Sequence, residues 1–198
     1  AWIQACQFIQ DLFNTWNVSP KGVSASDMLA YFVSERVAML IGPDYNYLSY
    51  SQTDGMTWDY APYPYFEDGV PVTPTGSWSL GINRNSQYKD AAARLIRFLT
   101  LNPVCIEWFK MDGHLPSNKT TLEYINSNPE YDEWPNTIFD LLQYESQNTA
   151  VARPLSPGYL EYENMLTTAF EDIRNGADIQ STLEQAEVRI DRAISRYL

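Results

Sequence analysis

Apolar residues repeat at helical spacing along most of this 198-residue chain, and this repeat constrains its fold more than any other feature. The first helical pattern runs from Trp2 to Trp16. Further helices are predicted over residues 24–35, 85–100, 103–109, 121–126, 137–143, 159–175 and 179–197. Gly113 and Gly176 suit helix ends, and Asp178 suits the cap of the last helix. The chain is therefore expected to be rich in helix.

Three short stretches have the character of strands, namely residues 37–41, 58–61 and 77–82. The proline-rich segment 62–74 is expected to be extended and loop-like. Strands that alternate with helices favour parallel pairing, so we expect an α/β fold with a small, mostly parallel sheet. Three strands are few for a free-standing doubly wound domain, which indicates that part of the fold is missing.

The length suits one domain, or one lobe plus part of another. No apolar run approaches the roughly 18 residues that a membrane span requires. No signal peptide is visible in residues 1–16, so for an exported protein we expect the signal to have been removed or to lie upstream.

The charge balance narrows the choice of partners. Lys and Arg total 13 and Asp and Glu total 25, which gives a net charge of −12. Such a surface repels phosphate backbones, and no basic cluster is found, so nucleic-acid binding is not expected. Neutral and cationic ligands both remain compatible. The chain also holds 6 Trp, 14 Tyr and 8 Phe; rings with a polar edge suit sugar recognition, although most of them are expected in the core.

Residues for metal or covalent chemistry are few. Cys6 and Cys105 lack metal-ligand spacing and are expected to be small buried apolar residues, with a disulfide as the alternative. The single histidine, His114, cannot build a multi-histidine metal site. No metal site and no cofactor are therefore expected.

No nucleophile elbow and no phosphate-binding glycine loop occur in the sequence, and no catalytic residue is expected. Acidic pairs of the kind used in glycoside hydrolysis are present at Glu67/Asp68, Glu161/Glu163 and Glu171/Asp172. The simpler interpretation is that these carboxylates are solvated charges. A glycan-processing enzyme remains the alternative.

Six ordered segments carry a family resemblance. Residues 32–43 combine a short helix with an Ala-Met strand and Gly42, residues 60–64 contain a Pro-x-Pro pattern, and residues 75–82 resemble a Gly-Gly hinge strand in which Ser77 replaces the second glycine. The other segments are 91–100, 113–116 and 152–154, with two closing helices after the last. In this order they resemble extracellular solute-binding proteins of ABC importers, of the maltose-binding type (family 1).

The resemblance implies a periplasmic-binding-protein-like (type II) receptor with two lobes. The chain would form its C-terminal lobe, and the first lobe would be largely missing. Residues 1–78 and 114–198 would belong to the C-terminal lobe, whereas residues 79–113 pack on the N-terminal lobe in relatives. Apolar faces made for that lobe would be exposed, fold back, or be buried by a second copy in a dimer of the truncated fragment.

Binding residues follow from the resemblance by position only. They are Asp44, Tyr45 and Tyr47 after the Ala-Met strand, Gly76, Ser77 and Trp78 at the hinge, and Arg153, Tyr159 and Tyr162 near the start of the closing helices. Each has a plainer alternative: Tyr45 and Tyr47 as surface turn residues, Trp78 as hinge packing, and Arg153 as a carbonyl cap. Ser77 puts a close backbone contact with the ligand in doubt.

The implied function is capture of a sugar by closure of two lobes, with an ABC permease as the membrane partner and an extracytoplasmic, lipid-anchored location. One alternative is a non-sugar solute such as a polyamine or a polyol phosphate. A phosphate requires several cations, and only Arg153 and Lys119 stand near the candidate loops. A sensor or interaction module is a further alternative that no sequence feature separates from transport.

Overall fold

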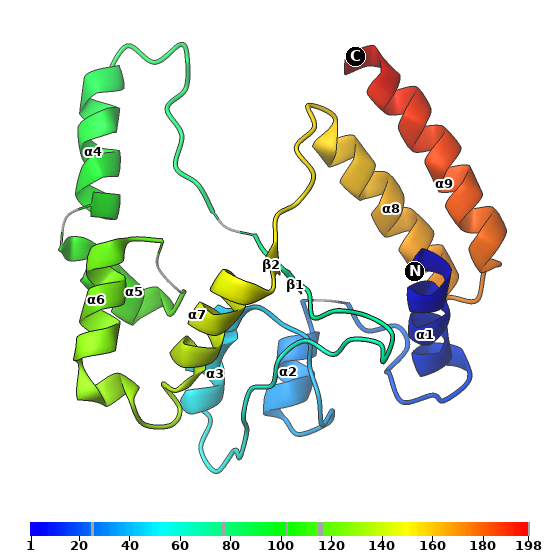
Figure 1. Ribbon diagram of the computed structural model, residues 1–198, viewed down its shortest axis with the longest axis horizontal. Helices are drawn as coiled ribbons and strands as arrows, with labels where there is room; N and C mark the ends of the chain where they lie inside the picture. Colours follow the sequence, from blue (N-terminus) through cyan, green and yellow to red (C-terminus); the bar gives the residue numbers. More distant parts are fainter. Residues whose placement is uncertain (25, 77, 102, 115–116, 198) are drawn as a thin grey trace. The chain divides into compact units, whose positions relative to one another are not determined.

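The computed structural model describes residues 1–24, 26–76, 78–101, 103–114 and 117–197 (Figure 1). These residues fall into two compact units. The terminal unit consists of Ala1–Ser24 and Pro154–Leu198, and the central unit consists of Ala25–Arg153. Among the described residues, no helix combines the length and the apolar character that crossing a membrane requires.

The terminal unit is built from three helices and a final turn. They are α1 (Trp2–Asn14), α8 (Tyr159–Arg174), α9 (Ile179–Ile194) and the 3-10 turn η3 (Ser195–Tyr197). The pair α8 and α9 is held together by small and branched side chains, since Ala169, Ala186 and Ile190 are all buried between them. The helical spacing of these residues in the sequence therefore marks a real packing face.

The end of α8 also attaches α1. Gly176 adopts φ +104°, its N–H donates to the Ile173 carbonyl at 2.9 Å, and the N–H of Ala177 donates to the Asp172 carbonyl at 3.0 Å. These are the two bonds of a Schellman motif. The side-chain amide of Gln10 in α1 then donates to the Ile173 and Ala177 carbonyls at 2.8 and 2.9 Å. The last carbonyls of a helix have no partner within the helix, and here the Gln10 amide supplies them with a hydrogen-bond donor.

The central unit contains short helices around an aromatic core, with one small sheet. Its elements are α2 (Met28–Val33), η1 (Asp44–Asn46), α3 (Tyr47–Ser51), β1 (Thr73–Pro74), α4 (Lys89–Leu101), α5 (Val104–Asp112), α6 (Lys119–Ser127), η2 (Pro129–Tyr131), α7 (Ile138–Asn148) and β2 (Ala150–Val151). β1 and β2 pair in parallel, with Thr73 opposite Ala150 and Pro74 opposite Val151. The predicted small parallel sheet is therefore present.

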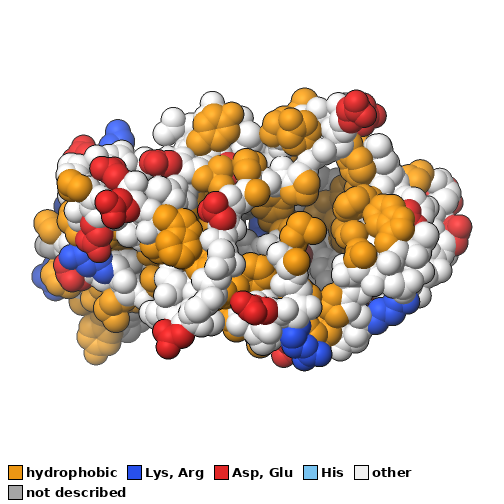
Figure 2. Space-filling model, turned by 90° about the horizontal axis from the view of Figure 1, so that it is seen from below, with side chains coloured by type: hydrophobic (Ala, Val, Ile, Leu, Met, Phe, Trp, Pro, Cys, Tyr) orange, Lys and Arg blue, Asp and Glu red, His pale blue; other side chains and the backbone are white. Residues whose placement is uncertain are grey.

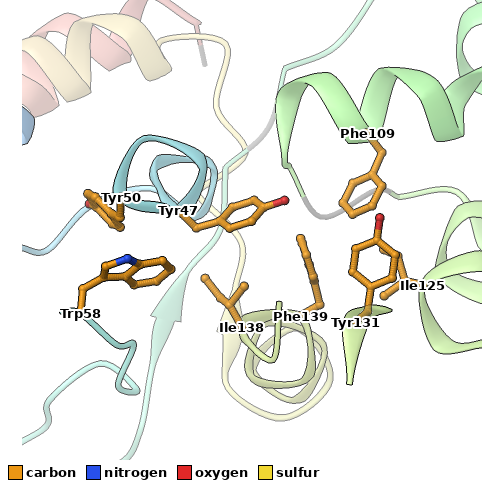
Figure 3. Packing of buried hydrophobic residues seen from close by; sticks show 8 residues of the cluster. All are labelled: Tyr47, Tyr50, Trp58, Phe109, Ile125, Tyr131, Ile138 and Phe139. Atoms are coloured by element: carbon orange, nitrogen blue, oxygen red, sulfur yellow. The ribbon is translucent and has the colours of Figure 1, made fainter. Parts of the chain in front are cut away.

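The core of the central unit is a chain of rings (Figure 3). Phe139 of α7 is 1% exposed, and its ring meets the rings of Tyr47, Phe109 and Tyr131 at centroid distances of 5.3, 5.1 and 5.7 Å. All three contacts are edge-to-face, the geometry that aromatic quadrupoles favour. This packing holds α3, α5, η2 and α7 in one cluster.

The predicted helices are confirmed, with shifts of a few residues at their ends. The patterns over 85–100, 121–126 and 137–143 correspond to α4, α6 and α7. The last helix stops at Ile194 and is followed by η3 instead of continuing to Tyr197. The helix α3 and the strands β1 and β2 were not predicted, because two or five residues are too few to show a period.

The predicted strands over 37–41, 58–61 and 78–82 are wrong, since none of these residues lies in a strand. The apolar run from 37 to 41 is largely exposed, with Met39 at 87%. A strand requires a neighbouring strand for its backbone donors and acceptors, and the described chain supplies none beside these segments. Ser77, which begins the third predicted strand, lies outside the described residues.

Apolar side chains also reach the surface elsewhere, over much of the face shown in Figure 2. In α4, the predicted apolar face is only half covered: Ala92, Ile96 and Leu99 are partly buried, whereas Leu95 is exposed. Both cysteines are buried and present as free thiols, as the sequence predicted. Burial raises the pKa of Cys6.

Candidate functional site

The first group of predicted site residues lies on the turn η1 and the start of α3. Asp44 is half-buried, and its carbonyl accepts a hydrogen bond from the hydroxyl of Tyr60 at 3.2 Å. Burial is the main reason that the pKa of Tyr60 is raised, so this hydroxyl stays protonated as a donor. The turn is thereby tied to the core, and it presents the Tyr45 ring, which is 39% exposed.

Tyr47 follows two residues later and points the other way. Its side chain is 6% exposed and its ring packs on Phe139 in the core (Figure 3). Desolvation raises the pKa of its hydroxyl, and the charge of Glu130 adds to the effect. A side chain so placed offers a ligand little surface, and what it contributes here is the anchoring of α3.

His114 stands against the same turn. Its ring centroid lies 4.3 Å from that of Tyr45, with the two planes inclined by 36°. The preceding residue, Gly113, lies close to α3, because a Cβ at that position would stand 2.6 Å from Cε1 of Tyr47. From the sequence, His114 was considered as a metal ligand and as part of the family segment 113–116. No local signal reveals its ring contact, since Tyr45 and His114 are far apart in the chain.

The second group lies beyond the ends of β1 and β2. The pairing continues past the strands, because the N–H of Thr75 donates to the Val151 carbonyl at 3.1 Å. This register carries Gly76 alongside Arg153, and a Cβ on Gly76 would stand 3.0 Å from the Nη2 atom of Arg153. The missing side chain therefore lets the guanidinium lie close to the backbone. Trp78 is 89% exposed, and Ser77 lies outside the described residues.

Tyr159 and Tyr162 belong to the terminal unit, in the first turn of α8. Their ring centroids are 5.9 Å apart, with the planes inclined by 44°. The hydroxyl of Tyr159 donates to Glu163 at 3.2 Å, and Tyr162 packs on the Ala169, Ala186 and Ile190 cluster. The structure thus brings these two tyrosines together, as their spacing on a helix requires.

The acidic pairs show no arrangement that favours acid catalysis. Glu161 accepts hydrogen bonds from Arg196 and from the Tyr197 hydroxyl, and donation by Arg196 is the main reason that its pKa is lowered. A general acid needs the opposite, a raised pKa. Glu67, Asp68, Glu171 and Asp172 are exposed. Among the described residues, no three His, Cys, Asp or Glu side chains gather in a way that could hold a metal ion.

An open concave surface lies on α4. Arg94, Arg97, Phe98 and Leu101 line an open depression on α4, and none of the predicted binding residues borders it. A depression formed by one helix face encloses no ligand, so we give it less weight than the placement of the exposed rings and Arg153.

The comparisons with known proteins point to one family. A family model described as bacterial extracellular solute-binding protein matches residues 1–104. This range holds η1 with Tyr45, and also β1, Gly76 and Trp78. No curated protein matches the chain.

Proposed function

The chain belongs to the bacterial extracellular solute-binding protein family, and from this premise we propose that it captures a sugar or an oligosaccharide. Members of this family are the solute-binding components of ABC transporters; they bind small molecules rather than transform them, work outside the cytoplasm and deliver their ligand to an ABC permease. The matched segment covers slightly more than half of the 198 residues.

The exposed rings of Tyr45 and Trp78 are the observation that carries the proposal. Tyr45 is presented by η1, and Trp78 follows the sheet at 89% exposure. A large exposed aromatic side chain is costly in water unless something covers it, and the C–H face of a pyranose is a suitable cover. The net charge of −12 also suits a neutral ligand better than an anionic one.

Hydrogen bonds would complete the recognition. In this proposal, the Asp44 carboxylate accepts from sugar hydroxyls while Arg153 donates to others, and Trp78 and Tyr45 stack on the ring. Gly76 serves by letting the Arg153 guanidinium lie close to the backbone. Tyr159 and Tyr162 of the terminal unit are further candidate contacts, to be tested by their own variants. No chemistry on the ligand is required.

Capture by closure is the proposed mechanism. The ligand would be buried between two lobes, and the closed form would be the one that the permease recognises. Residues 79–113 would pack on the N-terminal lobe, which agrees with the exposure of Leu95, Phe98 and Leu101 on α4. A lipid anchor would keep the receptor beside its permease.

A thermal-shift screen of the full-length protein tests this function. The panel contains glucose, maltose, maltotriose, cellobiose and trehalose, with spermidine and glycerol 3-phosphate representing non-sugar solutes. A ligand present at a hundred times its Kd adds about 2.7 kcal/mol, or a rise in Tm of about 5–10 °C. We expect such a rise with at least one sugar. A rise with spermidine or glycerol 3-phosphate alone would replace the sugar by that class of solute.

A further inference from the structure

The first turn of α8, which carries the candidate ligand residue Tyr159, is tied to the 3-10 turn η3. The Glu161 carboxylate accepts hydrogen bonds from the Arg196 guanidinium and, at 3.1 Å, from the Tyr197 hydroxyl. Both donors reach the same oxygen, Oε1, so one side chain of α8 holds two consecutive residues of η3. Hydrogen bonds to an ionised group are stronger than those between neutral groups. We call Glu161, Arg196 and Tyr197 the η3 latch.

The Tyr197 ring also packs on the residue from which α8 starts. Gly158, the N-cap residue, is buried, and a Cβ on it would stand 3.0 Å from Cε2 of Tyr197 and 3.3 Å from Cγ1 of Ile194. The missing side chain therefore leaves room for the ring. The Gly158 carbonyl accepts from the N–H groups of Glu161 and Tyr162 at 3.1 and 3.0 Å. The ring thus covers the residue that begins the hydrogen bonding of the helix.

The place of Tyr159 depends on this turn being helical. Its ring centroid lies 5.9 Å from that of Tyr162, and its hydroxyl donates to Glu163 at 3.2 Å. These partners are three and four residues further along the chain, the spacing that brings side chains together only on a helix. Helix ends open more easily than helix centres. A contact that holds the first turn of α8 closed therefore also holds the Tyr159 ring in place.

We infer that Arg196 and Tyr197 are positioning residues for ligand binding: through Glu161 and Gly158 they keep the first turn of α8 helical, and so place the Tyr159 ring for contact with the sugar. The inference rests on the proposed function, in which Tyr159 is a ligand contact. When only a fraction of the protein has the ordered turn, the apparent Kd rises in inverse proportion to that fraction. Loss of the η3 latch therefore weakens binding although no group that touches the sugar is removed.

Calorimetry on the full-length protein tests the η3 latch, with the panel sugar that gives the largest thermal shift. We expect the double variant Arg196→Ala/Tyr197→Ala to raise Kd about tenfold. Arg196→Lys keeps a cationic donor, so its Kd should stay within about threefold of the wild type. Arg192→Ala removes an exposed charge from the last turn of α9 and serves as the matched control, with an unchanged Kd. An unchanged Kd in the double variant overturns the inference.

A Tyr159→Ala background shows whether the η3 latch acts through that ring. In this background the additional change Arg196→Ala/Tyr197→Ala should alter Kd by less than about twofold, because the ring that the latch positions is already gone. A further tenfold rise would show that the latch affects binding by another route and would contradict the inference. The inference also fails if Tyr159→Ala binds the sugar as tightly as the wild type.

Amide hydrogen exchange, followed by NMR without any ligand, separates a local latch from a general loss of stability. In Arg196→Ala/Tyr197→Ala, the N–H groups of Glu161 and Tyr162 should exchange about tenfold faster than in the wild type. The N–H of Ala169, in the same helix but away from its start, should keep its rate. Equal acceleration at Ala169 would mean that the whole unit is destabilised, and the positioning role would be wrong.

The proposed function and the η3 latch fail in different ways. If the wild-type protein binds no sugar of the panel, the proposed function is wrong and the latch has no ligand contact to position. If the wild type binds a sugar and the double variant, folded by circular dichroism, binds it equally well, only the latch is wrong. If the double variant does not fold, Tyr197→Phe carries the test, since it removes one hydroxyl alone. We expect its Kd to rise about twofold to threefold, and an unchanged Kd refutes the latch.

Discussion

Gly113 joins the end of α5 to His114 in a left-handed conformation, with φ at +76°. Any side chain at this position meets two obstacles. The first is the backbone strain of about 1–2 kcal/mol that a Cβ causes at positive φ. The second is the contact with Tyr47, whose Cε1 atom lies 2.6 Å from the expected Cβ. Gly55 has nearly the same φ, +75°, with nothing within 4 Å.

Alanine substitutions at these two glycines separate the effect of backbone strain from the effect of a steric clash. We expect Gly113→Ala to lower the free energy of unfolding by about 2–5 kcal/mol, because overpacking adds about 1–3 kcal/mol to the strain. Gly55→Ala should lower it by only about 1–2 kcal/mol. Urea denaturation followed by tryptophan fluorescence measures both. Equal losses in the two variants would show that the close approach of Gly113 to Tyr47 does not exist in solution.

The sequence identifies individual site residues unevenly. Position in a motif selected Tyr45, Trp78 and Arg153 as candidates; the structure leaves all three exposed, and their role in binding stays a prediction. Motif position could not distinguish Tyr45 from Tyr47, because a 3-10 turn followed by a helix does not alternate its side chains as a strand does. His114 was missed as a partner of Tyr45, since a contact between distant segments leaves no local pattern.

At the scale of elements, α9 depends on the residue that caps its start, Asp178. The Asp178 carboxylate accepts a hydrogen bond from the Ser181 N–H at 2.9 Å, and this bond is the main reason that its pKa is lowered. A carboxyl whose pKa is lower in the folded state stabilises the fold fully above its unfolded pKa. That contribution disappears as the pH falls through the folded pKa.

Replacing the cap gives a pH-dependent prediction. At pH 7, Asp178→Ala should lower Tm by about 3 °C, whereas Asp178→Asn should lie close to the wild type because asparagine also caps helices. As the pH falls through the folded pKa, the gap between wild type and Asp178→Ala should narrow, and the gap between the two variants should persist. Differential scanning calorimetry measures Tm across this range of pH. A difference in Tm between the wild type and Asp178→Ala that grew as the pH fell would contradict this explanation.

The helix α7 carries Phe139, the most deeply buried ring of the central core. Phe139→Ala removes its contacts with Tyr47, Phe109 and Tyr131, and we expect a loss of about 3–5 kcal/mol in the free energy of unfolding. Tyr144→Ala on the same helix removes an exposed ring and should change stability by no more than about 0.5 kcal/mol. Chemical denaturation measures the pair. Similar losses at both positions would show that α7 buries a different face.

Helices were more predictable than strands for a physical reason. A helix satisfies its backbone hydrogen bonds within one segment, so the spacing of residues such as Ala186 and Ile190 is sufficient to predict it. A strand depends on a partner that its own residues do not specify. The run 37–41 has a strand-like composition without a neighbouring strand, whereas Thr73–Pro74 pairs with Ala150–Val151 across a large separation in sequence.

For the whole molecule, the order of motifs was more informative than composition. Composition indicated only an acidic, aromatic-rich domain, whereas four of the six motif segments fall within the residues 1–104 that match the solute-binding family. The identity of the solute is not encoded in such motifs, because it depends on which side chains meet around the ligand.

Calorimetric titration of the full-length protein with the panel sugars tests the central claim most directly, because heat of binding reports capture without a permease. We predict saturable heat with one site per protein for at least one sugar, and a clear loss of affinity in Trp78→Ala and Arg153→Ala. The protein used must show a folded helical structure by circular dichroism. If such protein gives no heat of binding with any sugar, the claim that this chain is part of a sugar receptor is contradicted.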